Sequence, residues 1–189
     1  LDRSSAASDV YKRQMLGMSK AGIFKYYKNK QELFIAVVDK FWFSTQNPRN
    51  KFTETNGTFA EFIDEYVRGV QRTMDMLGDL IGAEREKVAQ GKFTYHAQYF
   101  HFLFQLLQYD PDAKEKLRNL VDGDYAYWRA AIQRAIATGE LREDVDVEDA
   151  VVMFRQVYMG LSFEMAFMGG LNTQRLAKHL HAVYSLLKR

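Results

Sequence analysis

Four lysines near the start of the chain could bind an anionic partner. They lie within residues 15–30, which contain no Asp or Glu, at positions Lys20, Lys25, Lys28 and Lys30. Residues 1–30 hold seven Lys or Arg against two Asp or Glu, whereas residues 31–189 hold 19 against 22. A basic end on a mildly acidic chain indicates a phosphate-bearing or other anionic partner for that end alone. A basic segment that is merely solvated is the alternative.

Residues suited to catalysis or metal binding are sparse. The 189 residues include no cysteine, which excludes disulfides, zinc ribbons, iron–sulfur clusters and cysteine nucleophiles. His96 and His101 are five positions apart, and His179 and His181 are two apart, so neither pair shares a helix face as metal ligands four apart would. The chain has no glycine-rich phosphate loop, zinc-protease motif or serine-hydrolase motif. We therefore predict that the protein is not an enzyme and has no metal site and no cofactor.

The elements that must position the basic residues are predicted to be helices. Apolar residues recur at helical spacing, no segment alternates with a period of two, and the chain has only two prolines. Three predicted helix starts carry capping signals, which are Asn29 with Glu32, Thr58 with Glu61, and Asp146. Helix ends are predicted at residues 110–111, 139 and 169–170, where Pro or Gly follows an apolar run. The predicted fold class is all-α.

Three further segments carry specific expectations. Residues 99–107 (YFHFLFQLL) are apolar on nearly every side, which predicts a buried central helix. Residues 51–57 are polar and are expected to form a loop, and a short helix is expected near residues 81–90. No apolar run reaches the ~18–20 residues that cross a bilayer, and no signal segment opens the chain. We expect a cytoplasmic protein without a membrane partner.

The first residues do not follow any folding pattern. Residues 4–14, SSAASDVYKRQ, resemble the in-frame translation of a sequencing-library adaptor at all eleven positions. A segment of that origin must be left out of reasoning about the fold. We expect residues 1–14 to be non-native and the native sequence to begin at or near Met15.

Residues 17–34 (GMSKAGIFKYYKNKQELF) resemble the TetR family of transcriptional regulators, at the end of the family's N-terminal helix-turn-helix. The positions that fit the family pattern are Gly17, Ser19, Lys20, Ile23, Tyr26, Asn29, Lys30, Glu32 and Leu33. The tail, with GELR at residues 139–142 and DVD at 144–146, is similar to the family's effector-binding and dimerisation domain. The resemblance implies a partial DNA-binding domain in residues 15–45 and an effector-binding and dimerisation domain in residues 46–189. Two further helices precede the turn in the family, so we expect a truncated chain that binds DNA poorly.

The resemblance also implies which residues contact DNA, namely Ser19, Lys20, Ala21, Gly22, Lys25, Tyr26 and Lys30. A recognition helix must be slim where it meets base edges, and Ala21 and Gly22 are small. The flanking Lys20 and Lys25 can reach guanine acceptors or phosphates. By resemblance, Tyr26 and Lys30 hold the phosphate backbone, which fixes register without reading sequence. Phe24 stands where the family usually has tyrosine, so one hydroxyl contact to phosphate is not expected.

An effector cavity is implied among the middle helices, with apolar walls suited to a small hydrophobic or aromatic ligand. Two polar candidates, His101 and Gln105, lie four residues apart. The aromatic candidates are Phe41, Trp42, Phe62, Tyr66, Phe100, Phe104, Tyr125 and Trp128. Ordinary core packing is the alternative for each of them.

The last two helices are implied to pair with their symmetry mates in a homodimer. The expected dimer contacts are Phe154, Tyr158, Leu161, Met165, Leu180, Val183 and Leu187. Gly160 would allow close helix approach, and packing within one chain is the alternative.

These inferences predict a transcriptional repressor that leaves its DNA operator when a small ligand binds. A ligand does this by binding one of two conformations better than the other. The alternative is a dimeric helical ligand-binding or adaptor protein that does not bind DNA. Steeply salt-dependent retention on DNA discriminates the two.

Overall fold

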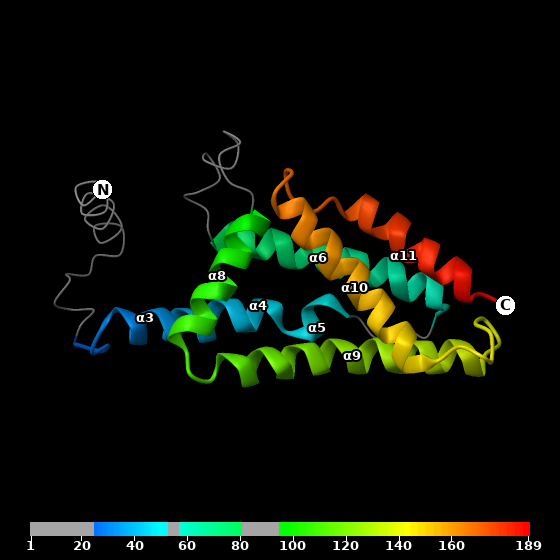
Figure 1. Ribbon diagram of the computed structural model, residues 1–189, viewed down its shortest axis with the longest axis horizontal. Helices are drawn as coiled ribbons and strands as arrows, with labels where there is room; N and C mark the ends of the chain where they lie inside the picture. The colour runs from blue at the N-terminus through cyan, green and yellow to red at the C-terminus, as the bar shows by residue number, and fades with distance from the viewer. Residues whose placement is uncertain (1–24, 53–56, 81–94) are drawn as a thin grey trace.

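The computed structural model describes residues 25–52, 57–80 and 95–189, and the regular elements of this part are all helices (Figure 1). The only β-type pairing described there is an isolated bridge between Leu141 and Lys188. The predicted all-α fold is therefore confirmed. The elements are α3 (Lys30–Val37), η1 (Val38–Phe43), α4 (Ser44–Gln46), α5 (Pro48–Lys51), α6 (Phe59–Leu80), α8 (Tyr95–Tyr109), α9 (Ala113–Ala137), α10 (Val147–Ala166) and α11 (Thr173–Leu187).

The predicted capping signals are confirmed. The Thr58 hydroxyl accepts from the Glu61 amide at 3.2 Å, and the Glu61 carboxylate accepts from the Thr58 amide at 2.8 Å. Asn29 accepts from the amide of Glu32 at 2.8 Å, and the side chain of Asp146 caps α10. The predicted helix ends also agree, since α8 stops at Tyr109 and α9 stops two residues before residue 139, a glycine with a positive φ of 75°.

Residues 30–46 form one continuous helix whose middle is wound differently. The first part is α3, the last part is α4, and the six residues of η1 between them form a π-helix. The junction residues Val38 and Ser44 keep right-handed helical dihedrals, so the chain does not break there. Short π segments within α-helices are rare and occur often at functional sites.

The main core is built where α6, α9, α10 and α11 meet, and α10 crosses between α6 and α9 (Figure 1). Its centre is Trp128 of α9, which is completely buried and stacks on Phe154 of α10 with ring centroids 4.8 Å apart. Tyr66 of α6 packs on the same indole at 4.9 Å. A second cluster around Val38 and Trp42 joins η1 to α8 and to the start of α9.

Glu140, in the connection between α9 and α10, ties down the start of α6. Its carboxylate accepts hydrogen bonds from the amides of Phe59, at 2.8 Å, and Ala60, at 3.3 Å. The hydroxyl of Tyr184 on α11 donates to the same carboxylate at 2.8 Å. A negative charge at a helix N-terminus is favourable because the first amides there have no partner within the helix.

Residues 99–107 are helical as predicted, within α8, but the expectation that this helix is buried is wrong. Leu106 of α8 is completely buried, but Phe104 is 64% exposed and Leu107 is 42% exposed. The helix packs with one face only, for example through Phe102 against Phe34 at 5.3 Å. An apolar face is buried only where a neighbouring element covers it, and no described helix of the same chain covers the face that carries Phe104.

The expectation of a polar loop over residues 51–57 is wrong at its first residue. Lys51 is the last residue of α5 and is only 5% exposed. Residues 53–56 and the helix expected near residues 81–90 lie outside the described residues. None of the described helices is long and apolar enough to cross a membrane.

Candidate functional site

The predicted DNA-contact residues are described only in part. Ser19, Lys20, Ala21 and Gly22 lie outside the described residues. Lys25 and Tyr26 are exposed in the turn before α3, and Lys30 is exposed as its first residue. The start of α3 lies at the end of the molecule opposite the C-terminus (Figure 1).

The predicted cavity residues separate into three groups. Tyr66, Trp128, Trp42 and Phe62 are buried in the two core clusters. His101, Phe104 and Phe41 are exposed, and Gln105 and Tyr125 are half-buried. The interior cavity described next is lined by Phe100 but by none of the other nine predicted residues.

That cavity has a volume of about 40 Å³ and is enclosed by α6, α8 and α10, with α4 at one side. Apolar side chains form much of its wall, and Ser162 contributes a hydroxyl. The volume holds a few water molecules at most, so a larger guest needs its wall to open. Two wall residues are methionines, whose flexible side chains repack readily. The lining residues are Gln46, Thr73, Met74, Leu77, Tyr99, Phe100, Tyr158, Met159 and Ser162.

A buried charged cluster adjoins this cavity. Asp124 of α9 is 3% exposed, and its Oδ2 lies 3.8 Å from Lys51 Nζ and 3.4 Å from Arg155 Nε. The Arg155 side chain is 11% exposed. Tyr158 connects the cluster to the cavity, because it lines the cavity and its ring centroid is 5.7 Å from Lys51 Nζ.

Several buried polar atoms of the interior have no hydrogen-bond partner among the described residues. They include the Tyr66 hydroxyl, the Ser162 hydroxyl, Arg155 Nε and Asp124 Oδ1, and also the indole nitrogens of Trp42 and Trp128. Burial, with smaller contributions from Tyr158 and Asp124, raises the pKa of the Tyr66 hydroxyl well above its ordinary value. That hydroxyl therefore stays a neutral donor. Unpaired buried donors are costly unless water or a ligand satisfies them.

Two glycines bring α5 close enough to place Lys51 in the interior. A Cβ on Gly69 of α6 would lie 2.0 Å from the Lys51 carbonyl oxygen. A Cβ on Gly123 of α9 would lie 2.9 Å from Pro48 Cγ. The start of α5 is fixed by Pro48 in its first turn and by Asn47, which caps the amide of Arg49 at 3.0 Å. The short helix is thus held between α6 and α9.

Sequence reasoning missed Lys51, Asp124 and Arg155. A signal existed for Asp124, which lies three residues after Val121 and four before Trp128, in the middle of an apolar stripe. A charged residue at an inward-facing position of such a stripe indicates a buried pair. Lys51 gave no comparable signal, because its burial depends on glycines in two other helices.

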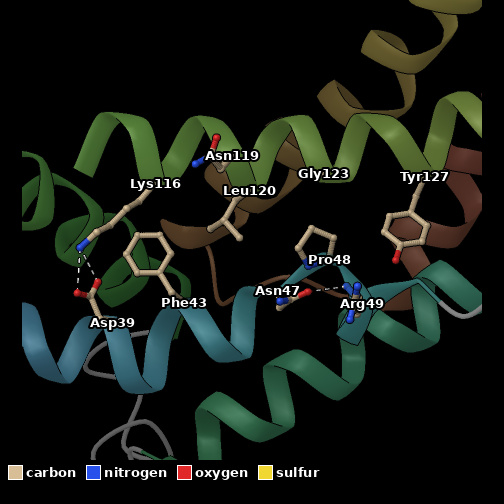
Figure 2. Close-up of a pocket in the computed structure, with 10 residues that line it drawn as sticks. All are labelled: Asp39, Phe43, Asn47, Pro48, Arg49, Lys116, Asn119, Leu120, Gly123 and Tyr127. Carbon is tan, nitrogen blue, oxygen red and sulfur yellow. Dashed lines mark hydrogen bonds and ion pairs between the residues drawn. The ribbon is translucent and has the colours of Figure 1, made fainter. Parts of the chain in front are cut away.

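A larger groove of about 550 Å³ runs along α9 beside η1, α4 and α5, and Figure 2 shows its lining. At one end Lys116 Nζ contacts Asp39 Oδ1 at 2.7 Å and Asp110 Oδ2 at 2.9 Å. Partial burial works against the charged lysine, but the hydrogen bonds to both carboxylates outweigh it and raise the pKa of Lys116. At the other end Pro48 lies on Gly123. The groove is open, so a small molecule there would stay largely solvated, and the interior is the better ligand site.

Most of the predicted dimer residues pack against the core of their own chain, although Leu161 and Val183 also line a groove on the outer surface. Phe154 and Leu180 are completely buried and Met165 is 9% exposed, while Tyr158, Leu161, Val183 and Leu187 pack half-buried against the main core. The opposite face is the exposed one and is also apolar. It carries Phe163, Phe167 and Leu186, which are 47%, 71% and 68% exposed, beside a groove of about 340 Å³ at Gly160. Dimerisation itself stays a prediction.

No group of three or more His, Asp or Glu side chains in the described part of the chain is arranged to hold a metal ion.

Comparison with known proteins gives one match. A family model described as "Tetracyclin repressor-like, C-terminal domain" matches residues 70–180, more than half of the chain. The matched range contains all of α8, α9 and α10, which supply part of the cavity wall together with Asp124 and Arg155. No curated protein and no solved structure matches the chain. Because the match spans more than half of its length, the chain belongs to the TetR family of transcriptional regulators.

Proposed function

We propose that the protein is a dimeric DNA-binding repressor that leaves its operator when a small ligand occupies the interior between α6, α8 and α10. The family match over residues 70–180 carries this proposal, because it includes α8, α10 and the end of α6, which supply all of the cavity-lining residues except Gln46. No catalytic step is needed for this function, and we expect none.

The position of α5 supports a route from the ligand to the DNA-binding end. Lys51 faces the buried cluster from the end of α5, and only Asn47 separates α5 from the continuous helix of residues 30–46. A ligand that binds better when Lys51 has left Asp124 favours a second placement of α5. Because α5 is packed on both Gly69 and Gly123, such a displacement is transmitted to the helix that begins at Lys30.

The DNA contacts in this proposal are the predicted ones, with Lys25, Tyr26 and Lys30 holding phosphate oxygens. All three are exposed at the same end of the molecule. Contacts of this kind fix the protein on the duplex and make its affinity fall with salt concentration.

The dimer contact is proposed on the outward face of α10 and α11. Phe163 packs edge-on against the half-buried Phe100 of α8, at 5.2 Å, and against the exposed Phe167, at 5.1 Å, so aromatic side chains continue from α8 to α10. Contiguous apolar surface of this kind marks an interaction site on a soluble protein. A twofold contact through it would place two DNA-binding ends on one duplex.

The test is retention on DNA. The protein is expressed from its native locus, so that whatever the reading frame encodes before Met15 is included, and selected against a pool of random duplexes. We expect bound sequences with two related half-sites and an affinity that falls steeply with salt. Absence of salt-dependent retention would contradict the proposal and favour a ligand-binding or adaptor protein that does not bind DNA.

A further inference from the structure

The interior next to the cavity carries more positive than negative charge. Lys51 and Arg155 both approach a single carboxylate, that of Asp124, and no other ion pair joins either cation to a described carboxylate. The three side chains therefore have a formal charge of +1 at a buried position. An uncompensated buried charge is strongly unfavourable, so this arrangement favours an anionic guest.

The ion pairs themselves are loose. Both cations approach the same oxygen, Asp124 Oδ2, at 3.8 and 3.4 Å, and Asp124 Oδ1 has no hydrogen-bond partner among the described residues. A tight ammonium– or guanidinium–carboxylate pair has donor–acceptor distances of about 2.7–2.9 Å. A triad that served only to stabilise the fold would be expected to close these distances. Arg155 Nε instead remains without a hydrogen bond.

The unpaired polar atoms of this region have a common character. Arg155 Nε can only donate, and the hydroxyls of Tyr66 and Ser162 are free to donate. Among the atoms of this region that have no hydrogen bond to a described residue, only Asp124 Oδ1 is restricted to accepting. A region rich in donors is satisfied by a guest rich in acceptors, and a carboxylate offers about four lone-pair sites.

The cavity that adjoins these donors is lined by apolar groups. Met74 and Leu77 come from α6, Phe100 from α8 and Met159 from α10. Ser162 lines the cavity with an unpaired hydroxyl, and Tyr158 lies between the cavity and Lys51. A guest held at this junction has its acceptor group on the cations and its apolar part in the cavity.

We propose that the ligand is a small organic acid whose carboxylate binds Arg155 and Lys51 and whose apolar or aromatic part enters the cavity as its wall opens at Met74 and Met159. This inference rests on the proposed function only for the identity of the site. The carboxylate replaces Asp124 as the partner of Lys51 and so loosens α5 from α9.

The experiment compares acids with their neutral amides on the full chain. The acids are benzoate, phenylacetate and hexanoate, and each is compared with its own amide, which is benzamide, phenylacetamide and hexanamide respectively. Binding is measured by calorimetry and by thermal unfolding. A ligand that binds only the folded state raises the unfolding temperature in proportion to its occupancy. We expect at least one acid to bind about ten- to a hundredfold more tightly than its amide, the range for a hydrogen-bonded charge.

Two arginine variants locate the effect. Arg155→Gln removes one cation and leaves Lys51 paired with Asp124, so the interior becomes neutral and the variant is expected to fold. It should bind the acid and its amide about equally. Arg129→Gln, at an exposed arginine on α9 that pairs with Glu148, should keep the preference of the unmodified chain. Asp124→Asn removes the competing carboxylate and should tighten acid binding wherever that variant folds.

Three results would overturn the inference. These results are that none of the acids binds, that an amide binds as tightly as its acid, and that Arg155→Gln keeps the preference for the acid. Equal stabilisation by inorganic phosphate would contradict the apolar half of the site. If a neutral amide binds and causes the protein to release DNA, the proposed repressor function is supported and the proposed ligand class is refuted. If an acid binds but the protein has no affinity for DNA, the proposed ligand class is supported and the proposed repressor function is refuted.

Discussion

Gly69→Ala tests whether α5 is seated on α6 as tightly as the structure indicates. A Cβ at position 69 would lie 2.0 Å from the Lys51 carbonyl oxygen, 2.5 Å from its carbonyl carbon and 2.6 Å from its Cα. Contacts below 3.0 Å are essentially never formed by real Cβ atoms. The obstacle is backbone rather than a flexible side-chain tip, so α5 must move away by about 1 Å.

The expected cost follows from two opposing effects. Overpacking of a close contact costs about 1–3 kcal/mol, and a backbone obstacle places this case near the upper end. Alanine in the interior of a helix regains about 1 kcal/mol relative to glycine. The net loss is about 2 kcal/mol, which for a chain of this length lowers the midpoint of thermal unfolding by roughly 4–8 °C. The displacement also separates Lys51 from Asp124, so acid binding should change with it.

The assay is urea and thermal unfolding of Gly69→Ala beside Gly160→Ala, with the two variants compared at matched protein concentrations over a dilution series. Gly160 is also inside a helix, but a Cβ there meets nothing within 4 Å. Its alanine variant should therefore gain about 0.5–1 kcal/mol. If both variants were equally stabilised, α5 would not be pressed on α6 and the reasoning would be refuted. A loss for Gly160→Ala that depends on protein concentration would instead report a dimer contact at that glycine.

Further predictions concern the far end of the body, the outward face and the DNA-binding end. Burial and the hydrogen bond to Glu140 raise the pKa of Tyr184 to about 12, above the unfolded value near 10, so this contribution to stability is complete below about pH 10 and is lost towards pH 12. Glu140→Gln should lower that pKa in a spectroscopic tyrosine titration; an unchanged titration would contradict the coupling. Phe163→Glu should convert a dimer to monomers in sedimentation, whereas Met76→Glu, at a residue of similar exposure (44% against 47%), should not; identical behaviour of the two would place the contact elsewhere. Lys30→Ala should weaken DNA binding and reduce the salt slope by about one, and an unchanged slope would remove Lys30 from the phosphate contacts.

Helix boundaries were predictable because their causes are local. The Thr58–Glu61 capping box, the cap at Asp146 and the glycine at position 139 each act within a few residues, and the structure confirms all three. The direction in which a stripe faces depends on distant elements. The stripe of α10 that includes Phe154 was assigned to a dimer contact, although Trp128 of the same chain covers it.

The interior site was less predictable for the same reason. Lys51 follows the polar residues Arg49 and Asn50 in the sequence, and its burial requires Gly69 and Gly123 to admit α5. Arg155 likewise becomes interior only because α9 supplies Asp124 opposite it. The π-helix of residues 38–43 has no counterpart in the pattern of apolar residues either. The aromatic candidates are identified by residue type alone, and half of the eight are buried in the two core clusters.

The hydrogen bonds of Glu140 also affect how the chain folds as it is made. The carboxylate that caps α6 is 81 residues downstream of Phe59, whose amide it binds. At about 5–20 residues per second, a ribosome needs roughly 4–16 s to extend the chain across that interval. During this time the first turn of α6 has only its local cap. The apolar face of α6 stays uncovered until α9 and α10 have been synthesised. The nascent chain therefore passes through a period in which a long amphipathic helix is exposed, and protection by a chaperone would matter most in that period.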